Sequence, residues 1–275
     1  MPSPKALLQS FESFAKKRFG QHFLCSDGII EKIILSARIE KDDQILEIGP
    51  GLGALTEGLL KLNQTYKAFE IDHDMIQFLK HRYPDIDVHQ GDASRVDWNT
   101  AIDGKWVCVS NLPYNVGTGI VTNMLKSVGR FSRLIVMLQQ EVALRMLAPA
   151  GDRRRGSLSV YCQLYAHVES LIFVPPGAFY PPPKVDSRVI LLEPRRHPIL
   201  LRFPVSEQSI ETLVRKGFSM PRKTIHNNLK SQYDKTLLAE SLSRAQIDPR
   251  QRPATLTVED WVLLAHSLEE LDSIG

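Results

Sequence analysis

The sequence predicts an α/β protein in which a wound sheet of mostly parallel strands is followed by a small domain made only of helices. Two observations support this prediction. Strand-like apolar runs alternate with helical periodicity from about residue 44 to residue 192, and strand signals stop after Pro194-Arg-Arg-His-Pro198. We therefore predict a first domain over residues 1–193 and a helical domain over residues 194–275.

The composition is that of an ordinary globular chain. Of the 275 residues, 43% are hydrophobic and 24% are charged, with a formal net charge of +3. No stretch approaches the roughly 18 apolar residues of a membrane helix, and no signal-like segment opens the chain, so we expect a cytoplasmic protein. We also expect it to be a monomer. Cys25, Cys108 and Cys162 lack the spacing of metal ligands and should be free thiols, so no metal site is expected.

The segment Gln44–Ala54 joins a strand to a helix through Gly49, Gly51 and Gly53. Glycine tolerates positive φ and lets a ligand approach the backbone, and the following helix offers free N–H groups. This pattern predicts a cofactor-binding turn, although a tight turn without a ligand would have the same glycines. The G-x-G-x-G spacing differs from the dinucleotide pattern G-x-G-x-x-G, which argues against NAD.

A basic segment precedes this turn. Lys16, Lys17 and Arg18 stand beside aromatic residues, and a helix whose N-cap is Ser26 follows. Such a charge run is either a solvated face or an arm that binds phosphates ahead of a segment folded over a ligand.

Carboxylates close the next two predicted strands. The strand at 66–72 ends with Glu70 and Asp72, before a helix over 74–82, and Glu70 is placed to bind the ribose of an adenosine-containing cofactor, with Asp72 as the alternative. The strand around 86–89 ends at Asp92, which can accept a hydrogen bond from an adenine amino group unless it serves only as a helix N-cap.

The fourth strand, at 106–110, runs into Asn111-Leu112-Pro113-Tyr114. The exocyclic amine of a base is a poor nucleophile because its lone pair is delocalised into the ring. The Asn111 side-chain oxygen and a carbonyl near Leu112 can accept hydrogen bonds from such an amine and stabilise the charge that develops on methylation. Pro113 would fix the bend, and Tyr114 would stack on an extruded base, although a simple turn with a buried tyrosine is the alternative.

Two loops of the first domain follow a strand at 134–138 and a helix at 140–148. Arg153, Arg154 and Arg155 either bind RNA phosphates or keep their loop soluble. The proline-rich loop 174–187 is stiff enough to hold Phe179 over a pocket, unless this ring is tucked into the core. The last strand of the domain is expected at 185–192.

The C-terminal region is helical in its spacing, with helices expected at 206–218, 223–231, 235–245 and 257–270. Arg215, Lys216, Arg222 and Lys223 surround Phe218, and residues 212–233 contain no acid. This distribution is typical of a surface that binds an RNA backbone, although the net charge is small.

Five segments, taken in order, resemble the ribosomal RNA adenine dimethyltransferase family, and within it the enzymes that act on small-subunit (16S) rRNA. They are Gly20-Gln-His-Phe-Leu24, Glu47-Ile-Gly-Pro-Gly-Leu-Gly53, Glu70, Gly91-Asp-Ala93 and Asn111-Leu-Pro-Tyr114. The first commonly reads Gly-Gln-Asn-Phe-Leu, so His22 replaces an asparagine. The resemblance covers almost the whole chain. It implies a Rossmann-like methyltransferase fold, S-adenosylmethionine as methyl donor, and dimethylation of the 6-amino groups of two adjacent adenosines near the 3′ end of 16S rRNA in the immature small subunit.

The resemblance also implies roles for individual residues. Cofactor contacts fall on His22, Leu24, Gly49, Gly51, Glu70, Asp92 and Asn111. The catalytic set is Asn111, Leu112, Pro113, Tyr114 and Phe179, of which Tyr114 and Phe179 would stack on the target base. The helical domain would dock on RNA. Two alternatives remain: a large-subunit (23S) rRNA methyltransferase that confers macrolide resistance, and a non-catalytic assembly factor that binds RNA.

Overall fold

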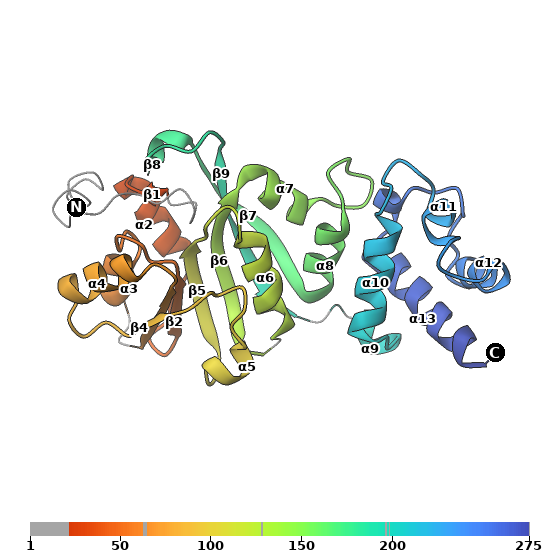
Figure 1. The fold of residues 1–275 in the computed structure, drawn as a ribbon, viewed down its shortest axis with the longest axis horizontal. Helices are drawn as coiled ribbons and strands as arrows, with labels where there is room; N and C mark the ends of the chain where they lie inside the picture. The colour runs from red at the N-terminus through yellow and green to blue at the C-terminus, as the bar shows by residue number, and fades with distance from the viewer. Residues whose placement is uncertain (1–21, 63–64, 128, 196, 198, 275) are drawn as a thin grey trace. The chain divides into compact units, whose positions relative to one another are not determined.

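One seven-stranded sheet, in the order β4-β3-β2-β5-β6-β9-β7, is built from strands between residues 44 and 194 (Figure 1). The strands are β2 Gln44–Ile48, β3 Tyr66–Glu70, β4 Val88–Gln90, β5 Trp106–Asn111, β6 Phe131–Gln139, β7 Ala166–Val174 and β9 Ser187–Pro194. Strand β2 pairs in parallel with both β3 and β5, so the chain order reverses there, whereas β9 is antiparallel to β6. The gap between the ends of β2 and β5 is therefore the topological switch point at which such sheets bind ligands.

The computed structural model describes residues 22–62, 65–127, 129–195, 197 and 199–274. Two compact units divide the chain. Unit 1 comprises residues 1–143 and 167–194, and unit 2 comprises residues 144–166 and 195–275. The wound sheet with its helices is the α/β fold that the sequence predicted, followed by a helical C-terminal region.

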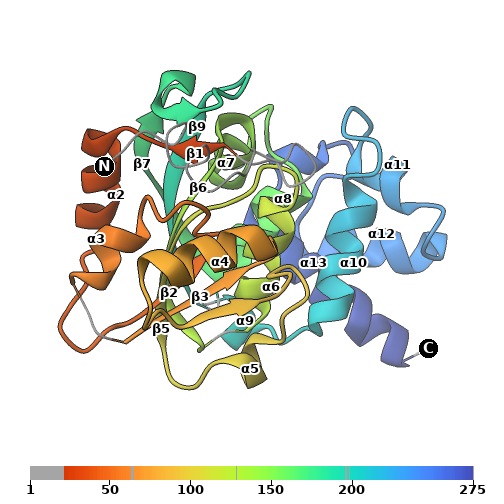
Figure 2. The same ribbon diagram turned by 60° about the vertical axis from the view of Figure 1, so that its left-hand side comes forward.

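The helices up to residue 165 mostly follow the strands, as a wound sheet requires. They are α2 Asp27–Ser36, α3 Thr56–Leu60, α4 His73–Arg82, α5 Trp98–Ala101, α6 Gly117–Lys126, α7 Gln140–Leu147 and α8 Ser157–Tyr165. Helix α4 begins after Asp72, whose side chain accepts a hydrogen bond from the Asp74 backbone N–H at 3.2 Å. Asp72 is thus the N-cap. In both ribbon views α2, α3 and α4 lie next to one another (Figures 1 and 2).

A second sheet of two short strands was not anticipated. Strand β1 (Phe23–Leu24) pairs antiparallel with β8 (Phe179–Tyr180), with Leu24 opposite Phe179. The short 3-10 helix η2 (Pro176–Ala178) leads into β8, and the Ala178 carbonyl accepts from the Cys25 backbone N–H at 2.8 Å. The pairing joins residues 22–24, which we call the N-terminal motif, to the proline-rich loop 174–187.

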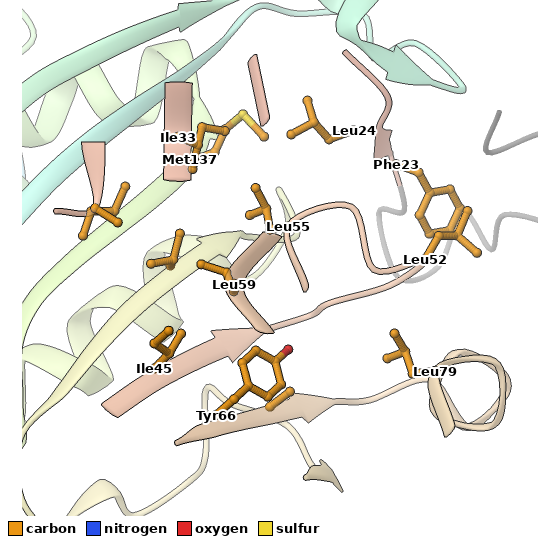
Figure 3. Close-up of a cluster of buried hydrophobic side chains, with 14 of the residues drawn as sticks. Phe23, Leu24, Ile33, Ile45, Leu52, Leu55, Leu59, Tyr66, Leu79 and Met137 are labelled. Atoms are coloured by element: carbon orange, nitrogen blue, oxygen red, sulfur yellow. The ribbon is translucent and has the colours of Figure 1, made fainter. Parts of the chain in front are cut away.

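Buried apolar side chains fill the space between the seven-stranded sheet and helices α2, α3 and α4 (Figure 3). Ile45, Leu59 and Leu79 are less than 1% exposed. Phe23 and Leu52 belong to the same cluster, so the glycine turn lies directly over a packed core. This packing holds the turn in one place.

Unit 2 is helical. Besides α8 it contains α9 Ile199–Arg202, α10 Glu207–Gly217, α11 Ile225–Leu229, α12 Lys235–Arg244, η3 Pro253–Thr255 and α13 Val258–Ile274. Trp261 of α13 is fully buried and stacks on Phe218, with ring centroids 5.4 Å apart. Helix α8 packs against α10 and α13, which is why residues 144–166 group with the helical unit. No helix of the described residues is long and apolar enough to cross a membrane.

Candidate cofactor and target-base site

The glycine turn has the backbone conformation that only glycine adopts freely. Gly49, Gly51 and Gly53 have φ angles of +63°, +57° and +78°. A Cβ on Gly51 would lie 3.2 Å from the Phe23 ring, and one on Gly49 would lie 3.7 Å from Pro113. The turn therefore packs between the N-terminal motif and the bend after β5, and a side chain at Gly51 would be both strained and crowded.

A pocket of about 710 Å³, counted with the open solvent at its mouth, lies at the switch point of unit 1. Four parts of the sequence contribute to its lining: His22–Leu24, residues of the Glu47–Leu55 segment, Glu70 with Ile71, and Asn111–Tyr114. The loops that follow β2, β3 and β5 thus meet at one rim, as the sequence pattern predicted.

Glu70 ties the end of β3 to the glycine turn. One carboxylate oxygen accepts from the backbone N–H groups of Ile71 and Asp72 at 2.8 and 2.9 Å, and the other accepts from Gly51 at 3.1 Å. Burial raises the pKa of Glu70, and the three backbone donors oppose this shift by stabilising its charge. Because Glu70 also lines the pocket, it can accept further hydrogen bonds from a ligand's hydroxyl groups.

A second buried carboxylate, Glu47, also lines the pocket. Its Oε2 accepts from the Tyr66 hydroxyl at 2.6 Å and from Thr56 Oγ1 at 2.7 Å. Burial raises the pKa of Glu47 to about 7, although both hydrogen bonds act in the opposite direction. Sequence reasoning did not single out this residue, and the available signal was a charge inside an otherwise apolar strand.

Strands β2 and β5 separate just below the pocket. Their last paired residues are Leu46 and Cys108. Beyond that point the buried Ser110 hydroxyl accepts from the Ile48 backbone N–H at 2.8 Å. A side chain thus replaces the missing ladder bond, so the strands can diverge without leaving this buried N–H unsatisfied.

Asn111 stands at the end of β5 with its amide oriented by the N-terminal motif. Its Nδ2 donates to the His22 carbonyl at 3.2 Å, which leaves Oδ1 as the acceptor. The bend is fixed because the Leu112 backbone N–H donates to the Met137 carbonyl at 3.1 Å and the Pro113 carbonyl accepts from Gly117 at 2.8 Å. The residues predicted for amine recognition therefore occupy defined positions at the pocket.

Tyr114 is half-buried and held at both ends. Its hydroxyl forms a hydrogen bond with Ser187, and its ring packs against the His22 imidazole with centroids 5.4 Å apart and planes tilted by 30°. His22 Nδ1 lies 2.7 Å from the Pro181 carbonyl oxygen. His22 thus connects the N-terminal motif, the bend after β5 and the proline-rich loop.

Two predicted site residues are not at the pocket. Phe179 is 3% exposed in the apolar core, because the β1–β8 pairing directs its ring inward beside Leu24, so it does not line the pocket. Asp92 accepts from Ser94 Oγ at 2.6 Å and from its backbone N–H at 3.0 Å, and does not line the pocket either. Phe179 thus follows the alternative of a ring in the core, whereas Asp92 is not a helix N-cap either, because a turn and not a helix follows it.

The predicted RNA-binding residues other than Arg155 either lie outside the described residues or belong to unit 2. Lys16, Lys17 and Arg18 lie outside the described residues. In unit 2, Arg153, Arg154, Arg215, Arg222 and Lys223 are exposed, and Lys216 is half-buried.

Arg155 is a correction, because the structure buries it to 4% exposure. It donates to the Ala148 carbonyl at 2.8 Å, to Gln163 Oε1 at 2.7 Å and to the Leu256 carbonyl at 3.2 Å. Its prediction as an RNA contact is therefore wrong. Its guanidinium satisfies backbone carbonyls of unit 2 instead.

A wound sheet of this order, with its pocket between the glycine turn and the Asn-Leu-Pro-Tyr bend, defines the class of S-adenosylmethionine-dependent methyltransferases. Two solved structures support the class. The chain is similar to a dimethyladenosine transferase from Plasmodium falciparum (TM-score 0.73, 28% identity, 92% of this chain and 98% of that one). It is also similar to the 23S rRNA methyltransferase ErmE (TM-score 0.66, 25% identity, 90% and 99%).

The family follows from the sequence comparisons. The family model for ribosomal RNA adenine dimethylase matches residues 13–270, and the chain belongs to this family. It is 38% identical to ribosomal RNA small subunit methyltransferase A of Synechococcus elongatus over 92% of this chain and 95% of that protein. The protein of the same name from Syntrophotalea carbinolica is 40% identical over 92% and 97%. This protein is accordingly an S-adenosylmethionine-dependent rRNA methyltransferase.

Proposed function

We propose that this enzyme dimethylates the 6-amino groups of two adjacent adenosines near the 3′ end of 16S rRNA, within the immature small ribosomal subunit, as a cytoplasmic monomer. Small-subunit enzymes supply the relatives at 38–40% identity, which favours this substrate over 23S rRNA. The observation that carries the chemistry is the position of Asn111, whose oxygen remains an acceptor at the pocket while its nitrogen is engaged by His22.

The pocket fits S-adenosylmethionine. Gly49 and Gly51 line the pocket and carry no side chain there. Glu70 lies at the end of β3, where it would accept hydrogen bonds from ribose hydroxyls. His22 and Leu24 would close the same side of the pocket. The bound cofactor supplies an electrophilic methyl group on a positively charged sulfur.

The chain's own contribution to catalysis is recognition of the amine. Asn111 Oδ1 and the Leu112 carbonyl would accept its two hydrogens, which localises the lone pair on nitrogen and stabilises the positive charge that develops there. No strong base is needed, because the proton becomes acidic only after the methyl has been transferred. Tyr114, fixed by Ser187 and His22, would offer its ring as a stacking surface for the extruded base.

The direct test is labelled methyl transfer to unmodified small subunits, with mass mapping of the product nucleotides. We expect Asn111→Ala to lower kcat by about 100-fold or more, the usual effect of losing a transition-state hydrogen bond. Its affinity for S-adenosylmethionine should change little, and the exposed Asn99→Ala should behave as the wild type.

Three outcomes would contradict this function. Full turnover in Asn111→Ala would remove the role of that residue. Methylation of 23S rRNA but not of small subunits would favour the large-subunit alternative. Binding of RNA without binding of S-adenosylmethionine would leave only the non-catalytic alternative.

A further inference from the structure

The loop between α10 and α11, residues 219–224, is exposed at every position from Ser219 to Lys223. The loop backbone nevertheless forms hydrogen bonds with one buried side chain, that of Asn228. Asn228 of α11 is 4% exposed, and its Oδ1 accepts from the Met220 backbone N–H at 2.8 Å and from Ser219 Oγ at 3.0 Å. Its Nδ2 donates to the carbonyls of Met220 at 3.2 Å and Thr224 at 3.0 Å. A single amide therefore joins both ends of the loop.

The two ends of the loop are anchored independently of Asn228. Phe218, just before the loop, stacks on the buried Trp261. Thr224, at its end, is the N-cap of α11, and its Oγ1 accepts from the Asn227 backbone N–H at 3.2 Å. Between these anchors, the Lys223 backbone N–H donates to the Met220 carbonyl at 2.9 Å and closes a turn. The Asn228 oxygen accepts hydrogen bonds from the loop while its nitrogen donates to loop carbonyls. Because all these bonds form only in one arrangement of the backbone, they favour a single loop conformation.

The side chains that this loop presents suit an RNA backbone. Arg222 and Lys223 are exposed and adjacent, and neither pairs with a carboxylate in the part of the chain that the structure describes. Met220, 41% exposed, adds an apolar surface next to them. A loop whose backbone already has one conformation loses less conformational freedom when its two adjacent cations meet phosphates.

We propose that Asn228 is a positioning residue that holds the loop 219–224 in its RNA-binding conformation in the free protein, so that Arg222 and Lys223 meet neighbouring phosphates together. The proposal rests on the proposed function, since the RNA is that of the methylation substrate. Asn228 itself does not contact the RNA. It acts through the two cations that the loop carries.

The test is a double-mutant cycle read out by salt dependence. We expect Asn228→Ala to weaken binding to unmodified small subunits about tenfold and to reduce the slope of log K against log[salt] by roughly 1, towards the value expected for losing one to two phosphate contacts. It should raise KM for subunits, while kcat and the affinity for S-adenosylmethionine stay the same. In an Arg222→Gln/Lys223→Gln background, Asn228→Ala should change affinity by less than about twofold, because its effect depends on the two cations.

The control for a general loss of stability is Leu238→Ala. Leu238 is fully buried in α12, makes none of the loop's hydrogen bonds, and should lower Tm without changing the salt slope. An equal loss of affinity from Asn228→Ala in both backgrounds, or an unchanged salt slope, would overturn the proposal.

A measurement on the wild type covers the case in which Asn228→Ala does not fold. The Met220 amide belongs to an exposed residue, yet it should be protected from hydrogen exchange in the free protein because it donates to Asn228. Exchange at the unprotected rate would contradict a preformed loop. If the proposed function itself were wrong, the wild type would not methylate small subunits at all, whereas failure of this proposal leaves methylation intact.

Discussion

The two basic loops of unit 2 look alike in the sequence and differ in the structure. Residues 151–156 place three arginines in a row, and residues 215–223 place four cations around Phe218. In the first loop Arg155 is buried among carbonyls, and Arg154 pairs with Asp152 at 2.6 Å. In the second, Arg222 and Lys223 remain exposed without an acidic partner among the described residues.

The difference shows that the neighbours of a cation decide its role more than the number of cations does. Arg155 follows the end of α7, where the Ala148 carbonyl needs a donor that the helix does not supply. Asp152 stands two residues before Arg154 and is close enough to neutralise it. The segment 212–233 contains no acid, so its cations stay available for another molecule.

The largest effect should come from removing the buried arginine of the first loop. Arg155→Ala deletes three hydrogen bonds, leaves the Leu256 carbonyl without its donor, and leaves the Ala148 carbonyl with Gln163 Nε2 at 3.0 Å as its remaining donor. We expect unit 2 to lose about 3 kcal/mol of unfolding free energy, the usual cost of breaking a buried charged network. Urea unfolding of the full chain measures this, with the exposed Arg153→Ala as the matched control. A change below about 0.5 kcal/mol would mean that Arg155 is not structural.

The next effect concerns RNA and should separate the two loops. Arg222→Gln/Lys223→Gln should weaken binding to small subunits about tenfold and lower the salt slope by roughly 1.5. Arg153→Gln/Arg154→Gln removes the same charge but should change affinity by less than about twofold, because Arg154 is already paired. Equal effects of the two double variants would show that total charge, and not its arrangement, governs binding.

Much of the fold and of the pocket could be predicted because each signal was local. The glycine turn, the carboxylate at the end of β3 and the bend after β5 each follow a strand-like run. Parallel strands bring such segments to one edge of a sheet, so Gly49, Glu70 and Asn111 line one pocket as expected.

The features that the sequence did not predict depend on contacts between segments that lie far apart in the chain. The β1–β8 pairing joins residues about 155 positions apart and buries Phe179, which no local pattern indicates. Arg155 bonds to Leu256, 101 residues away, for the same reason. Glu47 was overlooked as a site residue because its partners Tyr66 and Thr56 come from β3 and α3.

The smallest effect we expect is a shift in the titration of Asp152. Hydrogen bonds from the Arg154 side chain and backbone lower the pKa of Asp152 to about 2. Arg154→Gln should move this pKa up towards the ordinary ~3.9, which carboxyl NMR titration measures. Because the folded pKa is depressed, the pair's stabilising effect is present above the unfolded pKa and is lost as the pH falls through about 2. An unchanged midpoint in Arg154→Gln would mean that the side chain of Arg154 is as free as those of Arg222 and Lys223, and the contrast between the loops would then rest on Arg155 alone.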